Sequence, residues 1–170
     1  MSNVTKELQE ICLDIRSHWE SVSRQQKLIA LALVVDEDFR TLSVFLNTKS
    51  NLQQKISEDV FDEEVDEEDD WEAEDEEYFE FNCHEWAIDL EVESIDKFNQ
   101  ALSDSSLDKD QLFKKYLKLL SSLRKVVGKE VLLMVCVTDG DLEKEMSASI
   151  KYLNNQLEYQ RFNDWVQTWA

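Results

Sequence analysis

The chain has 170 residues and a formal net charge of -20, from 38 Asp and Glu against 18 Lys and Arg. This charge disfavours direct binding to nucleic acid or anionic lipid and favours basic partners. Two glycines and no prolines exclude glycine-rich phosphate loops and the nucleophile elbow of serine hydrolases. Hydrophobic residues make up 42% of the chain, enough for a folded core.

The N-terminal part predicts a helix followed by a hairpin. Apolar residues recur at three- and four-residue steps through residues 4–22, which is typical of an amphipathic helix. The continuous apolar run Leu28–Val35 predicts a strand buried on both faces. A polar segment follows at 36–40, and residues 41–46 then alternate in polarity, which predicts a second strand paired with the first.

The middle of the chain predicts one strand and two helices. Residues 86–92 alternate between apolar and acidic side chains, as expected of a half-buried strand with its acidic face outward. Ser94 is the predicted cap of a short helix that continues to Leu102. Asp108 is the predicted cap of the next helix, and Gly128 is expected to end it.

The C-terminal part predicts a buried strand over residues 131–137 and a helical stripe over 142–169, with a break at Asn154 and Asn155. Strands and helices do not alternate regularly. The chain therefore predicts a single α+β domain over residues 1–170, in which a small, mainly antiparallel sheet of about four strands packs with N-terminal, central and C-terminal helices.

The negative charge is concentrated in one segment. Residues 56–96 contain 21 acidic residues and no Lys or Arg. Subtracting these 21 from 38 leaves 17 acidic residues against 18 Lys and Arg, so the remainder is nearly balanced. We therefore treat residues 56–96 as an acidic segment inserted within the domain.

Aromatic residues interrupt the acidic segment, and this favours a binding role. Carboxylates speed the encounter with a basic protein, while Trp71, Tyr78 and Phe79 are candidate apolar anchors. The alternative is a solvated insertion without a partner. The predicted partner-binding residues are Asp62, Glu63, Glu64, Asp66, Glu67, Glu68, Asp69, Asp70, Trp71, Glu72, Glu74, Asp75, Glu76, Glu77, Tyr78 and Phe79.

No metal site, cofactor or catalytic residue is predicted. Cys83, His84 and Glu85 form the one cluster of ligand types, but no second Cys or His pair follows at zinc spacing. In a strand, Cys83 and His84 would also point to opposite faces. His18 is expected at the edge of the core, and the three widely spaced cysteines indicate reduced thiols and a cytoplasmic location. The first ten residues show no signal-peptide core, and no apolar run is long enough to span a membrane.

Three pieces of the chain together resemble a bacterial family, domain of unknown function 4303. They are the N-terminal helix leading to Leu28–Val35, the second strand ending in Leu46-Asn47-Thr48, and the strand at 130–137 ending in Thr138-Asp139. The segment around Trp86 is also similar to that family's central tryptophan segment. The resemblance implies a companion of polymorphic-toxin and contact-dependent systems, where small acidic proteins serve as immunity factors. It implies no catalytic residue, and the acidic run here is more extreme than the family's usual central segment.

Four functions remain open at this stage. The first is neutralisation of a basic protein, most plausibly a toxin or effector domain such as a nuclease. The second is mimicry of a phosphate backbone toward a nucleic-acid-binding protein, which requires carboxylates on a rigid surface. The third is an enzyme whose site is built from scattered residues. The fourth is a stable domain whose acidic insertion is only solvated.

Overall fold

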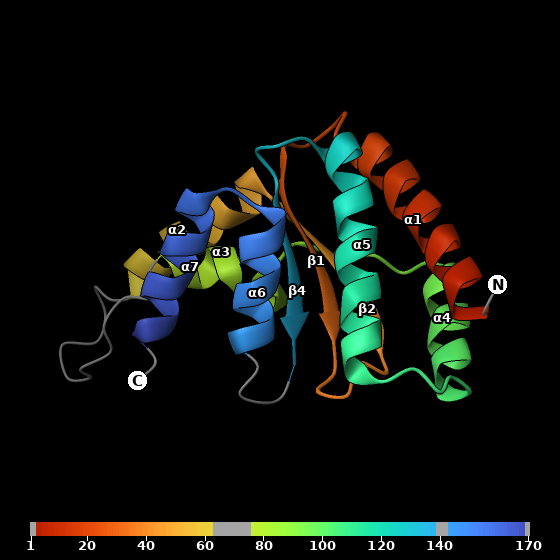
Figure 1. The fold of residues 1–170 in the computed structure, drawn as a ribbon. Helices are drawn as coiled ribbons and strands as arrows, with labels where there is room; N and C mark the ends of the chain where they lie inside the picture. Colours follow the sequence, from red (N-terminus) through yellow and green to blue (C-terminus); the bar gives the residue numbers. More distant parts are fainter. Residues whose placement is uncertain (1–2, 63–75, 139–142, 169–170) are drawn as a thin grey trace.

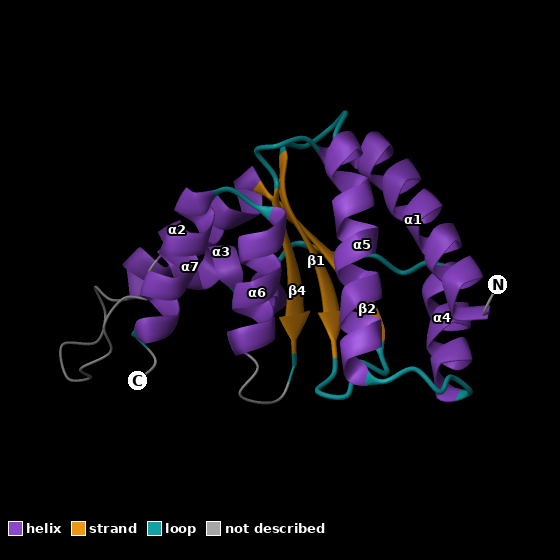
Figure 2. Ribbon diagram, in the orientation of Figure 1, coloured by secondary structure: helices purple, strands orange, loops and turns teal. Residues whose placement is uncertain are grey.

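A four-stranded sheet in the order β3-β2-β1-β4 lies at the centre of the structure, and helices pack around it (Figures 1 and 2). The structure is a computed structural model that describes residues 3–62, 76–138 and 143–168. In chain order the elements are α1 Asn3–Val22, β1 Leu28–Val35, β2 Leu42–Thr48, α2 Lys49–Asp62, α3 Glu76–Phe81, the 3-10 helix η1 Cys83–Glu85, β3 Ile88–Asp89, α4 Glu93–Ser103, α5 Lys109–Val127, β4 Leu132–Val137, α6 Glu143–Leu153 and α7 Gln156–Gln167.

The sheet confirms the predicted α+β class and its mainly antiparallel character. β1 pairs antiparallel with β2, and β2 pairs antiparallel with the short β3. β1 also pairs in parallel with β4, which returns to it after the whole middle of the chain. Nearly every side chain of β1 and β4 is buried, because packed elements cover both faces of these strands.

The helices form two groups about the sheet. Figure 1 shows α1 and α5 side by side against the strands, while α6 runs along β4. α3 and α7 contact each other, and α2 contacts α3, so these three helices gather beyond the β4 side of the sheet. Among the described residues, no helix combines the length and apolar character that a membrane crossing requires.

An asparagine closes each long edge of the sheet. Asn154, between α6 and α7, accepts the backbone N–H of Leu133 at 2.8 Å and donates to the carbonyl of Leu133 at 2.7 Å. On the opposite edge, Asn99 of α4 makes the same pair of bonds with Leu42, at 2.8 and 3.0 Å. Asn154 thus pairs with two backbone groups of the edge strand β4, and Asn99 with two at the start of β2, where β3 does not reach.

Several predicted helix ends are confirmed. Asp108 caps α5 through a reciprocal capping box with Gln111, and α5 ends at Gly128, whose φ of 94° favours glycine. Asn155 caps α7 by accepting the backbone N–H of Glu158, so the predicted break between the last two helices lies where expected. These ends depend on contacts within a few residues, which is why the sequence predicts them.

Two predictions in the middle of the chain are wrong. The strand expected over 86–92 is reduced to Ile88–Asp89, which pair with β2; the 3-10 helix Cys83–Glu85 precedes them, and α4 follows from Glu93. Ser94 does not cap α4: the cap residue is Val92, and Ser94 lies buried inside the first turn. The extended backbone of Val92 starts the helix earlier than the side-chain pattern indicates.

Two further differences concern a helix and a histidine. Sequence analysis does not predict α2, whose start is fixed by Thr48 accepting the backbone N–H of Asn51 at 3.1 Å. The helix presents few apolar residues to the domain, so its pattern is weak; Leu52 is its one side chain classed as buried among those described. His18 is exposed on α1 rather than at the edge of the core.

Candidate functional site

The predicted partner-binding residues fall into two groups in the structure. Residues 63–75, which include Trp71 and most of the predicted carboxylates, lie outside the described residues. Asp62 is the last residue of α2, and Glu76 to Phe79 belong to α3. The described members therefore lie on either side of the densest acidic run in the sequence.

α3 is held to the domain through its aromatic side chains. Phe79 is 6% exposed and its ring meets that of Tyr78 edge-on, with centroids 5.2 Å apart. Phe81 is fully buried against Phe162 of α7. Phe79 is thus part of the packed interior of this structure, so its ring is not displayed as a surface anchor in the way the sequence analysis expects.

Two carboxylates of α3 form ion pairs with one arginine, which also lies 3.7 Å from Glu158. Arg161 of α7 donates to Glu77 Oε1 at 3.2 Å and to Glu80 Oε1 at 3.1 Å, and its guanidinium lies 5.9 Å from the centre of the Phe81 ring. Burial opposes the charged form of Arg161, but the charges and hydrogen bonds of Glu80 and Glu77 outweigh it and raise the pKa of Arg161. Arg161 therefore fastens α3 to α7.

Burial raises the pKa of Glu80 above its ordinary value of 4.5, and Arg161 offsets this only in part. The folded-state pKa exceeds the unfolded one, so ionising Glu80 costs more in the folded protein. Relative to the Glu80→Gln variant, the wild type is expected to be most stable below about pH 4.5 and to lose that advantage as pH rises through the raised pKa.

Urea unfolding of both proteins from about pH 4 to about pH 8 measures this difference in the free energy of unfolding. The Glu76→Gln variant, which removes an exposed carboxylate from the same helix, controls for the loss of one negative charge. A stability difference that grows with pH in favour of the wild type would contradict the expected sign.

A second ion pair joins α2 to η1. Lys55 of α2 donates to Glu85 of η1 at 2.8 Å. The hydrogen bond and charge of Glu85 raise the pKa of Lys55. The Arg161 contacts thus join α3 to α7, and the Lys55 contact joins α2 to η1. These are the described elements that flank the acidic run.

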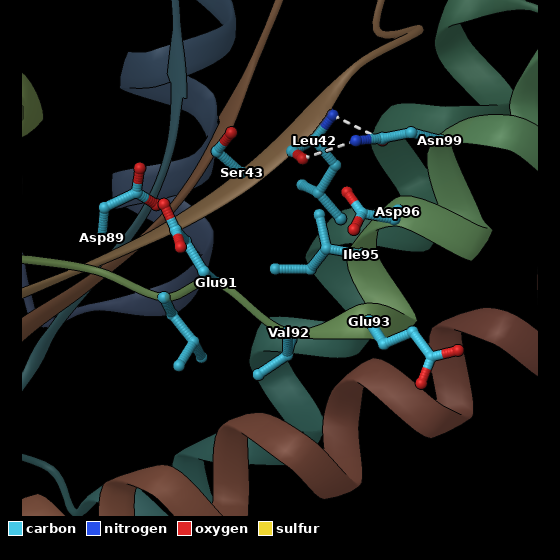
Figure 3. Close-up of a pocket in the computed structure, with 10 residues that line it drawn as sticks. Leu42, Ser43, Asp89, Glu91, Val92, Glu93, Ile95, Asp96 and Asn99 are labelled. Carbon is cyan, nitrogen blue, oxygen red and sulfur yellow. Dashed lines mark hydrogen bonds between the residues drawn. The ribbon is translucent and has the colours of Figure 1, made fainter.

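Beyond η1, the acidic segment lines a hollow at the β3 edge of the sheet, with a volume of about 420 Å³ (Figure 3). We call it the acidic hollow. Its lining residues are Leu42, Ser43, Asp89, Leu90, Glu91, Val92, Glu93, Ile95, Asp96 and Asn99. Four of the ten carry carboxylates and none carries a positive charge, so the hollow is electrostatically suited to a cation.

Three carboxylates of the acidic hollow have no cation to pair with. Asp89, Glu91 and Asp96 are exposed and form no ion pair with any residue in the described ranges, whereas Glu93 pairs with Lys97 at 3.0 Å. Figure 3 shows Asp89 and Glu91 on the strand side and Asp96 on α4. Exposed carboxylates of this kind are placed to meet a positively charged group from outside the domain.

Rigid backbone supports these carboxylates. Asn99 of α4 is hydrogen-bonded to both backbone groups of Leu42, as Figure 3 shows. Leu90 joins the sheet by donating to the carbonyl of Val44 at 2.8 Å. Leu42, Leu90 and Ile95 are buried and anchor the lining of the hollow to the core. The charged head of a Lys or Arg side chain suits the exposed carboxylates above them.

Sequence analysis missed the acidic hollow as a site. The alternating acidic residues of 86–92, among them Asp89 and Glu91, indicated an exposed acidic face. The pattern could not show that Asp96, from the next helix, lines the same hollow. The analysis also expected Cys83 and His84 to diverge, and this is wrong: with Cys136 of β4, their ligand atoms all lie within 4.8 Å of one another.

Comparison with protein-family models, with curated proteins and with solved structures found no match to this chain. The fold and the site define an α+β domain that carries an acidic hollow. The acidic segment next to this hollow is held to other helices by ion pairs.

Proposed function

We propose that this chain is a cytoplasmic binding protein that neutralises a basic protein partner, and that the partner is a bacterial toxin or effector domain such as a nuclease. The observation that carries the proposal is the division of the acidic segment. Some of its carboxylates form ion pairs that hold the domain together, while Asp89, Glu91 and Asp96 of the acidic hollow are exposed and form no ion pair with the described residues.

The division matters because paired carboxylates add little to an external field. Arg161 and Lys55 partly compensate the charges of Glu77, Glu80 and Glu85. Asp89, Glu91 and Asp96 keep theirs, and the net charge of -20 adds a long-range field. Such a field steers a positively charged partner and raises its association rate, most strongly at low salt.

The resemblance to domain of unknown function 4303 adds the class of partner. The resemblance implies a companion of polymorphic-toxin systems, in which small acidic proteins serve as immunity factors. A nuclease cleft is positive because it holds phosphates, and Lys or Arg side chains from such a cleft complement the carboxylates of the acidic hollow. Binding there would keep the cleft from its substrate.

The test is the association rate with a basic protein encoded beside this chain and purified after co-expression. The variant Asp89→Asn/Glu91→Gln/Asp96→Asn removes three charges from the acidic hollow. We expect it to associate at least about tenfold more slowly than the wild type at low salt, and the difference to shrink as ionic strength rises. Stopped-flow fluorescence measures both rates.

A matched variant separates this site from net charge alone. Glu37→Gln/Asp110→Asn/Glu130→Gln also removes three exposed carboxylates, all outside the acidic segment. It is expected to change the rate much less, because these groups lie away from the hollow. Equal slowing by both triple variants would contradict the hollow as the contact, and a rate independent of salt would contradict electrostatic steering.

A further inference from the structure

We infer that Cys83, His84 and Cys136 form a zinc site. One ligand atom from each residue, Sγ, an imidazole nitrogen and Sγ, lies within 4.8 Å of the others. In a tetrahedral zinc centre with bonds of about 2.0–2.3 Å, neighbouring ligand atoms are roughly 3.5–3.8 Å apart. The three groups therefore need to close by only about 1 Å to hold the ion.

The fold explains how adjacent residues converge. Cys83 and His84 lie in η1, where the Asn82 side chain accepts the backbone N–H of His84 at 3.2 Å and holds the turn. With three residues per turn, consecutive side chains are about 120° apart instead of the 180° of a strand. Both can therefore face Cys136 near the end of β4.

The chemistry of the three groups suits zinc. Two thiolates and a neutral imidazole cancel the charge of Zn²⁺, which matters because Cys83 is 0% exposed and Cys136 is 4% exposed.

The site leaves a fourth position open. Cys136 and His84 line a hollow of about 290 Å³ together with Glu143 and Met146 of α6. His84 is exposed at its rim, so an ion can enter from solvent. Three protein ligands with an open fourth position are typical of zinc sites that bind a water or a substrate. The same ion would also join η1, at the end of the acidic segment, to the sheet.

The experiment is a Co²⁺ titration of the reduced protein, followed by displacement with Zn²⁺. The absorption spectrum of bound Co²⁺ identifies its ligands, because thiolate coordination gives a charge-transfer band and carboxylate coordination does not. This separates the site from loose binding by the acidic run. We expect about one Co²⁺ per chain with thiolate absorption, and its loss when zinc is added.

Variants assign the ligands. Cys136→Ser is expected to lose most of the thiolate absorption, and His84→Ala to weaken cobalt binding by at least about tenfold. The His84 side chain is exposed, so its variant is expected to fold normally, as circular dichroism will show. Cys12→Ser is the control, because Cys12 lies between α1 and α5, hydrogen-bonded to Ser122.

Two outcomes would overturn the zinc site. One is cobalt uptake by the wild type without thiolate absorption, which would leave only the carboxylates as ligands. The other is thiolate absorption of equal strength and affinity in His84→Ala, Cys136→Ser and the wild type. Neither outcome depends on a protein partner, so the zinc site and the proposed function stand or fall separately.

Discussion

Replacing Phe162 by alanine is expected to lower the free energy of unfolding by about 4 kcal/mol. The Phe162 ring is fully buried in α7 and packs against Phe81, with ring centroids 5.3 Å apart, and against Trp165, at 5.9 Å. These contacts join α7 to α3, so the substitution leaves a cavity between these two helices. Urea unfolding followed by far-ultraviolet circular dichroism measures the change.

The control for this prediction lies on the same helix. Leu157 of α7 is 63% exposed, so Leu157→Ala is expected to change the free energy of unfolding by no more than about 0.5 kcal/mol. A loss below about 1.5 kcal/mol in Phe162→Ala would show that the α3–α7 contact does not contribute to the folded core.

Replacing Asn154 by alanine is expected to cost about 3 kcal/mol. Its side chain makes four hydrogen bonds: it accepts from Arg124 and the backbone of Leu133, and it donates to the carbonyls of Leu133 and Ile150. Alanine would leave the edge of β4 and a half-buried guanidinium without these partners, and desolvated groups left unpaired are costly. Chemical denaturation of the variant and the wild type gives the difference.

The neighbouring Asn155 provides the comparison. Its side chain makes one described hydrogen bond, to the backbone N–H of Glu158 at the start of α7, so Asn155→Ala is expected to cost about 1 kcal/mol. Equal losses in the two variants would mean that closing the edge of β4 adds nothing beyond an ordinary helix cap.

Local signals account for the parts of the fold that were predicted correctly. The apolar run Leu28–Val35 is a buried strand, and the Asp108 cap and Gly128 end of α5 lie where the pattern places them. Each signal acts within one turn or one strand, so no distant contact is needed to interpret it. The helix α2 was missed because Leu52 is almost alone in marking its packed side.

Contacts between residues far apart in the sequence determine which carboxylates of the acidic segment are paired and which line the hollow. Composition shows that residues 56–96 hold 21 carboxylates and no Lys or Arg. It does not show that Arg161, distant in the chain, pairs with Glu77 and Glu80, or that Asp96 of α4 joins Asp89 in one hollow. Pairing of this kind depends on where helices pack, and packing is not encoded by the local pattern of charge.

By itself, the sequence determined the α+β class, the principal strands, most helix ends and the place of the negative charge, because periodicity and caps act between near neighbours. Only the tertiary structure decided which carboxylates are paired and which face outward. It also brought Cys83 and His84 to Cys136, since a 3-10 turn replaced the expected strand and the sheet placed β4 beside it. These contacts depend on how the helices and strands pack together, which the pattern of residues along the chain does not show.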